Sequence, residues 1–248
     1  MKHLQDVLYE GILDIDDNAK KEPNFKGVIE KFLENNYEGA STCKISKDLN
    51  PNGKYVVDSV GSMEVKNRNI DSLTNGLFVF GEIKKDFNCS YCISLTSLEG
   101  APEKVGGDFN CQGCKSLTSL EGVPKEIKKD FKCSYCISLT SLKDAPEKVG
   151  GNFNCHGCIS LTSLKGSPKE IKKNFDCAYC KSLTSLEGAP EKVGGDFNCV
   201  DCDLLTTLIG SPKIIKGYFN CVRCNSLTSL EGAPKYIYGE FLKPDHLE

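Results

Sequence analysis

A 22-residue repeat fills most of this chain and constrains its fold more than any other feature. Each copy approximates the pattern F-x-C-x-x-C-x-S-L-T-S-L-x-G-x-P-x-x-[VI]-x-[GK]. Seven copies follow one another, beginning at Phe87, Phe109, Phe131, Phe153, Phe175, Phe197 and Phe219. A fixed period of about 20–50 residues is typical of a solenoid, in which each unit buries its apolar face only by stacking on its neighbours. The repeat therefore predicts a stack of coils.

Two columns of the repeat alternate between glutamate and lysine, and they do so in opposite phases. One column holds Glu103, Lys125, Glu147, Lys169, Glu191 and Lys213, and the next holds Glu82, Lys104, Glu126, Lys148, Glu170 and Lys192. Coils stacked in register about 4.8 Å apart would place opposite charges side by side in both columns. Each exposed pair contributes only about 0.2–1 kcal/mol, so the pattern sets register more than it adds stability. The alternation predicts in-register stacking.

The chain divides into three regions by pattern. Residues 1–42 form a small helical N-terminal region, because their apolar residues follow helical spacing, with Asn24 as an N-cap and Gly39 as a stop. Residues 43–83 are expected to form a β-rich N-terminal cap with a degenerate repeat. Residues 84–248 are expected to form the seven-copy solenoid and a short C-terminal cap.

The stretch FNCQGCKSLT at residues 109–118 resembles the core of the leucine-rich repeat, L-x-L-x-x-N/C-x-x-L. Phe109 and Cys111 stand at the inward strand positions, and Leu117 and Leu120 continue the core. Cys114 stands where the family places an Asn or Cys whose side chain satisfies backbone groups of the following loop. The resemblance is to the short bacterial and phage-type repeats, and it covers about residues 64–241.

This resemblance implies an α/β-type repeat protein. Its architecture would be a leucine-rich-repeat-like solenoid with a curved ladder of parallel strands, preceded by the small α-helical region. It also implies a partner bound on the strand face. One spacing departs from the family, because Val105 lies four residues before Phe109 where the family uses three. A bulge or a shifted turn is expected there.

The cysteine pairs raise the question of a metal. C-x2-C-x18-C-x2-C falls within the spacing of structural zinc sites. Two observations count against zinc. Four-cysteine sites built from neighbouring pairs would use six of the seven pairs and leave one without a partner. A strand also places Cys111 on the inward face beside Phe109. Free cysteine behaves as a small buried hydrophobe. We interpret the pairs as reduced core thiols without metal or cofactor, and keep a zinc-binding structural repeat, and disulfide or redox chemistry, as alternatives.

Nothing in the sequence predicts catalysis. Only three histidines occur, His3, His156 and His246, so a serine or cysteine nucleophile lacks an obvious base, and no phosphate-binding glycine motif occurs. A net charge of −3 disfavours non-specific binding of nucleic acid. No apolar run approaches the roughly 20 residues of a membrane span, and no secretory signal is recognisable. The chain is therefore expected to be non-enzymatic and cytoplasmic.

The two columns between the cysteines vary most from copy to copy, and they predict where a partner binds. Tyr91, Tyr135 and Tyr179 recur on every second coil, about 10 Å apart. Tyrosine and arginine are favoured at interfaces, although half-exposed tyrosines that cover the core are the alternative. Asp201 and Arg223 break the pattern in the last copies.

A second set of candidates comes from the strands. Asp108, Asp130 and Asp196 are expected to point outward as a mildly acidic ladder that suits a basic protein partner.

The sequence thus favours a protein-binding scaffold, such as a bacterial effector or phage protein that binds and inhibits a host protein. A small-ligand or nucleotide binder that uses Lys128, Lys129, Lys172 and Lys173 is an alternative. A homo-oligomer through the solenoid end is a further expectation, since an open sheet edge invites pairing.

Overall fold

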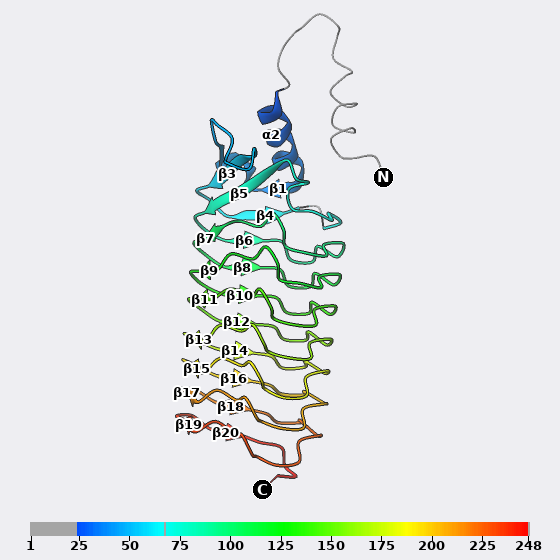
Figure 1. Ribbon diagram of the computed structural model, residues 1–248, viewed down its shortest axis with the longest axis vertical. Coiled ribbons are helices and arrows are strands. Elements are labelled where there is room, and N and C mark those ends of the chain that lie inside the picture. The colour runs from blue at the N-terminus through cyan, green and yellow to red at the C-terminus, as the bar shows by residue number, and fades with distance from the viewer. Residues whose placement is uncertain (1–23, 67, 248) are drawn as a thin grey trace, which may run out of the picture.

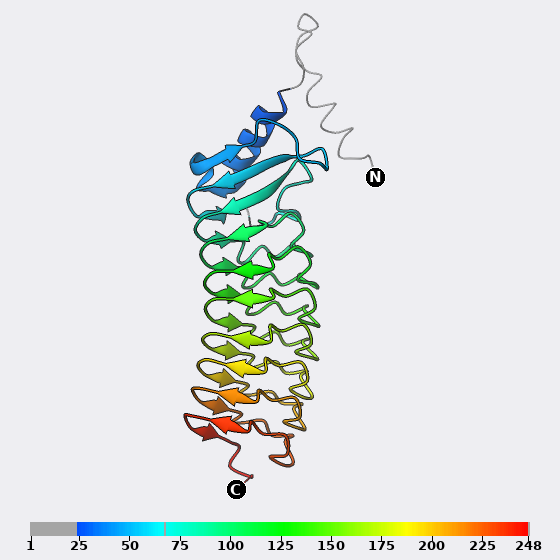
Figure 2. The same ribbon diagram turned by 60° about the vertical axis from the view of Figure 1, so that its left-hand side comes forward.

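The computed structural model describes residues 24–66 and 68–247, which form a β-solenoid with one short helix at its N-terminal end (Figure 1). The predicted solenoid of parallel strands with a small helical N-terminus is therefore confirmed. The chain folds into two sheets that run along the whole stack, whereas the leucine-rich-repeat resemblance implied one ladder. Each coil contributes one short strand to each sheet, as the turned view in Figure 2 shows.

The first sheet, called the Phe sheet, contains the phenylalanine of every repeat. Within the described residues its ten strands run in the order β1 (Tyr37–Glu38), β4 (Met63–Val65), β6 (Phe87–Asn88), β8 (Phe109–Asn110), β10 (Phe131–Lys132), β12 (Phe153–Asn154), β14 (Phe175–Asp176), β16 (Phe197–Asn198), β18 (Phe219–Asn220) and β20 (Phe241–Leu242). All neighbours are parallel except β1 and β4.

The second sheet, called the Val/Ile sheet, contains the apolar residue that follows the charged columns. Its ten strands in the described residues are β2 (Cys43–Ile45), β3 (Tyr55–Ser59), β5 (Phe78–Ile83), β7 (Lys104–Val105), β9 (Glu126–Ile127), β11 (Lys148–Val149), β13 (Glu170–Ile171), β15 (Lys192–Val193), β17 (Ile214–Ile215) and β19 (Tyr236–Ile237). Only β2 and β3 pair antiparallel.

The spacing of four between Val105 and Phe109 is explained by this second sheet. Val105 ends β7 in the Val/Ile sheet and Phe109 begins β8 in the Phe sheet, so the chain turns a corner between them. Gly106 sits in that corner, where an added Cβ would lie 2.2 Å from the backbone oxygen of Lys84. The expected shifted turn is thus a corner between two sheets.

The helix α2 (Phe25–Asn36) closes the N-terminal end of the core. The Oδ1 atom of Asn24 accepts a hydrogen bond from the amide of Gly27 at 3.0 Å, which confirms the predicted N-cap. Ile29 and Leu33 are buried against the solenoid. The chain then continues through β1 and a 3₁₀ turn, η1 (Ala40–Thr42). The helical pattern at residues 4–13 lies outside the described residues.

Equivalent phenylalanines stack on one another along the core. From Phe87 to Phe241 the ring centroids of adjacent coils are 5.0–5.9 Å apart. The other inward positions of the repeat, such as Cys111, Cys114, Leu117 and Leu120, are fully buried, as is Phe109. Each coil therefore completes the core of the next, as a solenoid requires.

The register of the sheets pairs opposite charges, as the alternating columns predict. Glu82 lies opposite Lys104, and Glu170 lies opposite Lys192. In the neighbouring column, Lys213 Nζ is 2.8 Å from a carboxylate oxygen of Glu191. In-register stacking is confirmed.

A ladder of aspartate and asparagine, which we call the Asx ladder, ties the coils together at the start of each Phe-sheet strand. In each step the side-chain Oδ1 of one coil accepts the backbone amide of the equivalent residue one coil later, at 2.8–3.1 Å. The acceptors are Asp86, Asp108, Asp130, Asn152, Asn174 and Asp196. These side chains are mostly half-buried, so the expected outward-pointing acidic ladder has a role inside the fold.

The Asx ladder makes a testable prediction at Asp130. Its Oδ1 accepts both the backbone amide and the side-chain Nδ2 of Asn152, at 2.8 and 3.1 Å. Replacing Asp130 by Ala leaves a half-buried amide without its acceptor, so we expect a loss of about 1–3 kcal/mol in the free energy of unfolding. Asp130→Asn keeps an acceptor and should lose less. The measurement is urea denaturation of each variant.

The control is Glu147→Ala, which removes an exposed side chain and should change stability by less than about 0.5 kcal/mol. An Asp130→Ala protein as stable as this control would show that the Asx ladder does not stabilise the fold.

Candidate interaction surface at the cysteine turns

Each C-x-x-C forms a tight turn that leaves the Phe sheet. The second residue between the cysteines adopts the left-handed conformation, with φ of 58° at Tyr91, 56° at Tyr135, 58° at Tyr179, 56° at Asp201 and 61° at Arg223. Residues other than glycine seldom adopt this conformation, because their Cβ crowds the backbone. Five copies therefore carry a side chain where glycine would be less strained.

Glycine fills this position in the two remaining copies for a steric reason. A Cβ added at Gly113 would lie 2.5 Å from Cδ1 of Tyr91, and one added at Gly157 would lie 2.7 Å from Cδ1 of Tyr135. The rings of Tyr91 and Tyr135 thus lie over the glycines of the next coil. The alternation of tyrosine and glycine follows from the space that the ring needs.

The cysteine thiols bond to the backbone inside the turn. The Sγ of Cys114 donates to the carbonyl of Cys89, one coil earlier, at 3.2 Å. The same bond joins Cys136, Cys158, Cys180, Cys202 and Cys224 to the first cysteine of the preceding coil, at 3.1–3.4 Å. The side chain at the leucine-rich-repeat Asn/Cys position therefore satisfies a backbone group, here in the preceding coil.

Burial favours the protonated form of several thiols of the repeat, whereas at Cys224 hydrogen bonds from the thiols of Cys199 and Cys202 lower the pKa from its ordinary value of 9.0 to about 4. Burial raises the pKa of Cys221 from the same ordinary value of 9.0 to about 12, and it also raises the pKa of Cys177. For Cys111, a thiol contact with Cys136 and burial together raise the pKa. Thiolates, the form that binds metals and reacts as a nucleophile, are disfavoured at Cys111, Cys177 and Cys221. In residues 24–66 and 68–247 no group of three or more His, Cys, Asp or Glu side chains is arranged to hold a metal ion.

Apolar side chains line the outside of the cysteine turns. We call this surface the cysteine-turn stripe and define it as Tyr91, Ile93, Tyr135, Ile137, His156, Ile159 and Tyr179. Tyr91, Ile93, Tyr135, Ile159 and Tyr179 are among the exposed large hydrophobic residues of the described chain. Solvent-exposed apolar side chains aligned over several coils are typical of an interaction surface.

The centre of the stripe is an aromatic cluster around His156. Its ring lies 5.2 Å from the ring of Tyr135 and 5.0 Å from that of Tyr179, so it bridges tyrosines two coils apart. Its Nδ1 is 3.6 Å from Oδ2 of Asp176. A shallow hollow of about 510 Å³ lies over this cluster, lined by Tyr135, Ile137, His156, Gly157, Ile159, Tyr179 and Lys181.

Charged residues border the stripe on its C-terminal side. The Nη2 of Arg223 donates to the hydroxyl of Tyr179 at 3.2 Å and pairs with Asp201. Lys181 lies 5.4 Å from the centre of the Tyr179 ring and 2.9 Å from a carboxylate oxygen of Asp203. Asp201 and Arg223, predicted as partner contacts, therefore lie with Tyr179 at one end of the stripe.

The predicted site residues thus separate into two groups. Tyr91, Tyr135, Tyr179, Asp201 and Arg223 lie at the cysteine turns, whereas Asp108, Asp130 and Asp196 lie in the Asx ladder. Sequence reasoning missed the isoleucines of the stripe. The repeat position directly after the second cysteine could have revealed them, because it varies between apolar and charged residues. It holds Ile93, Lys115, Ile137, Ile159, Lys181, Asp203 and Asn225.

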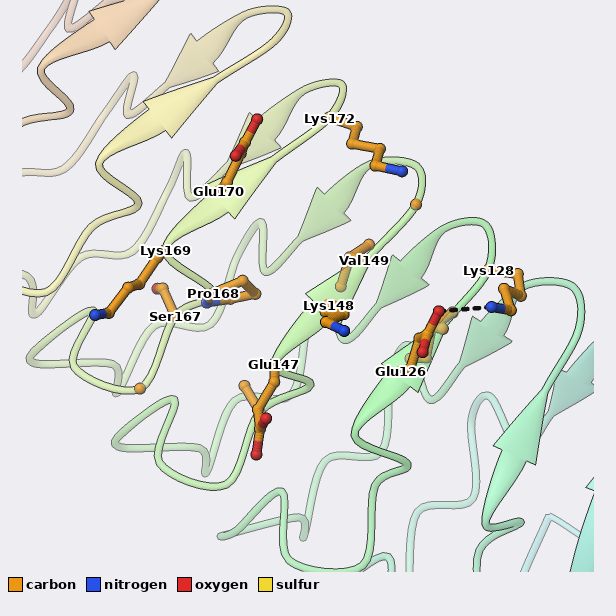
Figure 3. Close-up of a pocket in the computed structure, with 14 residues that line it drawn as sticks. Glu126, Lys128, Glu147, Lys148, Val149, Ser167, Pro168, Lys169, Glu170 and Lys172 are labelled. Carbon is orange, nitrogen blue, oxygen red and sulfur yellow. Dashed lines mark hydrogen bonds and ion pairs between the residues drawn. The ribbon is translucent and has the colours of Figure 1, made fainter.

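A larger hollow, of about 640 Å³, lies on the Val/Ile sheet (Figure 3). It opens where Gly150 leaves a gap between Lys128 and Lys172, two of the lysines expected to hold a small anionic ligand. Glutamates surround these lysines, and Lys128 Nζ is 2.6 Å from Oε1 of Glu126 (Figure 3). The mixed charge gives this hollow little preference for an anion.

Comparison of the chain with protein-family models, curated proteins and solved structures returned no match. In the described part of the chain, no helix has the length and apolar character needed to cross a membrane.

Thiol labelling tests the burial of the cysteine turns. Fourteen of the fifteen cysteines are buried, and Cys43 is partly exposed, with a pKa raised by burial to about 11. We expect a thiol-specific reagent to modify at most Cys43 in the native protein, at a rate that rises with pH towards that pKa. All fifteen should react in denaturant.

Cys43→Ser is the matched control and should abolish native labelling. Rapid modification of several thiols in that variant would contradict the closed core.

Proposed function

We propose that this protein is a non-enzymatic protein-binding scaffold and that the cysteine-turn stripe contacts its partner. The observation that carries the proposal is the row of exposed tyrosine and isoleucine side chains on adjacent turns. A repeat solenoid fits such a role, since it presents an extended surface on a rigid stack. Tyrosine is enriched among the residues that dominate binding energy at interfaces.

The geometry of the stripe favours an extended partner segment. Tyr135 and Tyr179 lie two coils apart, which is about 10 Å at strand spacing. Three residues of a segment in the extended polyproline II conformation span nearly the same distance, about 9 Å, and side chains three positions apart then lie on one face. A polyproline II segment running along the solenoid axis, with an apolar side chain at every third position, would place those side chains in the hollow around His156.

The biological role that we propose is that of a bacterial effector or phage protein acting in the cytoplasm. The resemblance of the repeats to short bacterial leucine-rich repeats supports it. A scaffold without catalytic groups would inhibit a host protein by occupying its surface.

Selection from a displayed library of random peptides tests the stripe directly, because it requires no identified partner. We expect the wild-type protein to enrich peptides with apolar residues three positions apart. The double variant Tyr135→Asn/Tyr179→Asn should bind them at least about tenfold more weakly, because it removes two aromatic contacts. Asparagine tolerates the left-handed conformation of both positions, so the fold should persist.

Ile209→Asn is the control, since Ile209 is exposed but lies outside the cysteine turns. Equal affinity of the selected peptides for wild type and double variant would rule out the stripe as the binding surface.

The zinc alternative has its own measurement. Because thiols such as those of Cys114 and Cys136 already donate to backbone carbonyls inside a closed core, we expect the purified, reduced protein to contain less than about one zinc per chain by elemental analysis. Several zinc ions per chain, lost together with the fold on chelation, would favour the zinc-binding structural repeat.

A further inference from the structure

The two ends of the solenoid are built differently. At the N-terminal end, β1 and β2 pair antiparallel with their neighbours, and α2 lays Ile29 and Leu33 over the core. Figure 1 shows this helix closing the top of the stack. A strand edge that is turned or covered in this way does not template further pairing.

At the C-terminal end, the described residues add no further strand to either sheet after the last coil. β19 and β20 each have one neighbour in their sheets. Phe241 and Ile237 are only partly buried, whereas Phe219 and Ile215 one coil earlier have no exposed surface. The red tail in Figure 2 after β20 is residues 243–247. There Pro244 is buried, Leu247 packs against the core, and Nε2 of His246 is 2.8 Å from the carbonyl oxygen of Leu227.

The last coil presents backbone groups in the pattern used between all coils. In the Phe sheet each coil donates to the next, as in the bonds from the amides of Phe219 to Glu240 O and of Cys221 to Leu242 O, at 3.0 and 2.9 Å. The amides of Phe241 and Lys243 occupy the equivalent positions one coil later. They therefore point to the place where a further coil would lie.

The Val/Ile sheet presents the complementary groups. There each coil donates to the preceding one, as in the bond from the amide of Tyr238 to Ile215 O at 3.0 Å. The carbonyl of Ile237 is the next acceptor in this series. The edge strands thus offer both donors and acceptors, because a residue of a parallel ladder directs its N–H and its C=O to the same neighbouring strand.

Surface columns change character at the same place. The column of alternating Glu82 to Lys192 continues as Ile214 and Tyr236. Tyr218 follows the last member of the Asx ladder, and Tyr238 stands in the lysine and glycine turn column. All three tyrosines are exposed, and Tyr238 reaches 75%. Apolar aromatic surface replaces charge beside the open edge, as expected of an interface.

We propose that the C-terminal coil is the interface of a homodimer, in which β20 pairs antiparallel with β20 of a second copy about a two-fold axis. Centred on Phe241, this pairing makes the two Phe241 residues a hydrogen-bonded pair that exchanges both N–H···O bonds. Both rings then point into the core, so the phenylalanine stack continues from one copy into the other.

A second copy fits this end better than any other strand, because it has the same cross-section and the same inward residues. The N-terminal end is closed by α2, so each copy has one end to offer. Pairing of like ends satisfies both copies and stops at the dimer, whereas head-to-tail stacking would continue into a fibre.

The dimer would present two cysteine-turn stripes on one rigid body. A partner with two binding segments would then bind with an increased effective concentration. Dimer formation does not depend on the proposed function, since the interface and the stripe are different surfaces.

The test is the mass of the full chain in solution by sedimentation and native mass spectrometry. We expect twice the monomer mass of 27.2 kDa at protein concentrations between about 1 and 100 µM. Hydrogen exchange should show slower exchange of the Phe241 and Lys243 amides as concentration rises. A monomer throughout this range would overturn the proposal.

Lys243→Pro locates the interface. It removes an amide that points away from the chain's own fold, and the preceding Leu242 is already extended, as a residue before proline must be. We expect this variant to be monomeric and to keep its affinity for stripe-selected peptides. The stripe variant Tyr135→Asn/Tyr179→Asn should remain dimeric. A Lys243→Pro protein that is still dimeric, or a dimer without slowed exchange at Phe241 and Lys243, would also overturn the proposal.

Discussion

In-register stacking of equivalent residues is the constraint on which this structure depends. Each side chain contacts the equivalent side chains one coil above and one coil below. A column of the repeat must therefore hold either residues that pack well against copies of themselves, or two residue types that alternate and complement each other in charge or size. Phenylalanine stacks on phenylalanine at 5.0–5.9 Å. Exposed glutamate alternates with lysine, because like charges at strand spacing repel. Tyrosine alternates with glycine because its ring occupies the space of the next side chain.

Polar columns follow the same rule through hydrogen bonds. Aspartates one coil apart would repel one another if nothing offset their charge. Each Asx side chain accepts a hydrogen bond from a backbone amide of the next coil. In addition, Lys132 Nζ lies 2.7 Å from Oδ2 of Asp108 and 3.7 Å from Oδ2 of Asp130. The cysteines solve a related problem at the turn. A thiol is small enough for a closed core, and it can still donate to the carbonyl that the turn leaves free.

Much of the fold was predictable because it is periodic. The phenylalanine spacing predicted the solenoid, the Glu and Lys columns predicted its register, and Asn24 predicted the start of the helix. The second sheet was not predicted. The extra residue between Val105 and Phe109 is explained equally well, from sequence alone, by a bulge within one strand and by a corner between two sheets. Asp108, Asp130 and Asp196 were expected to face outward, because the amides that they bind lie 22 residues away in sequence.

The sequence by itself determined which residues meet, because a constant period places equivalent residues of successive coils in contact. Only the tertiary structure decided which columns become core, ladder or exposed surface. That division depends on backbone angles at the corners and on bonds between coils. The left-handed conformation at Tyr135 turns its ring outward over Gly157, and the isoleucines beside it then complete an apolar stripe. The open C-terminal edge is likewise a tertiary property, because it arises where stacking stops and not from any local pattern.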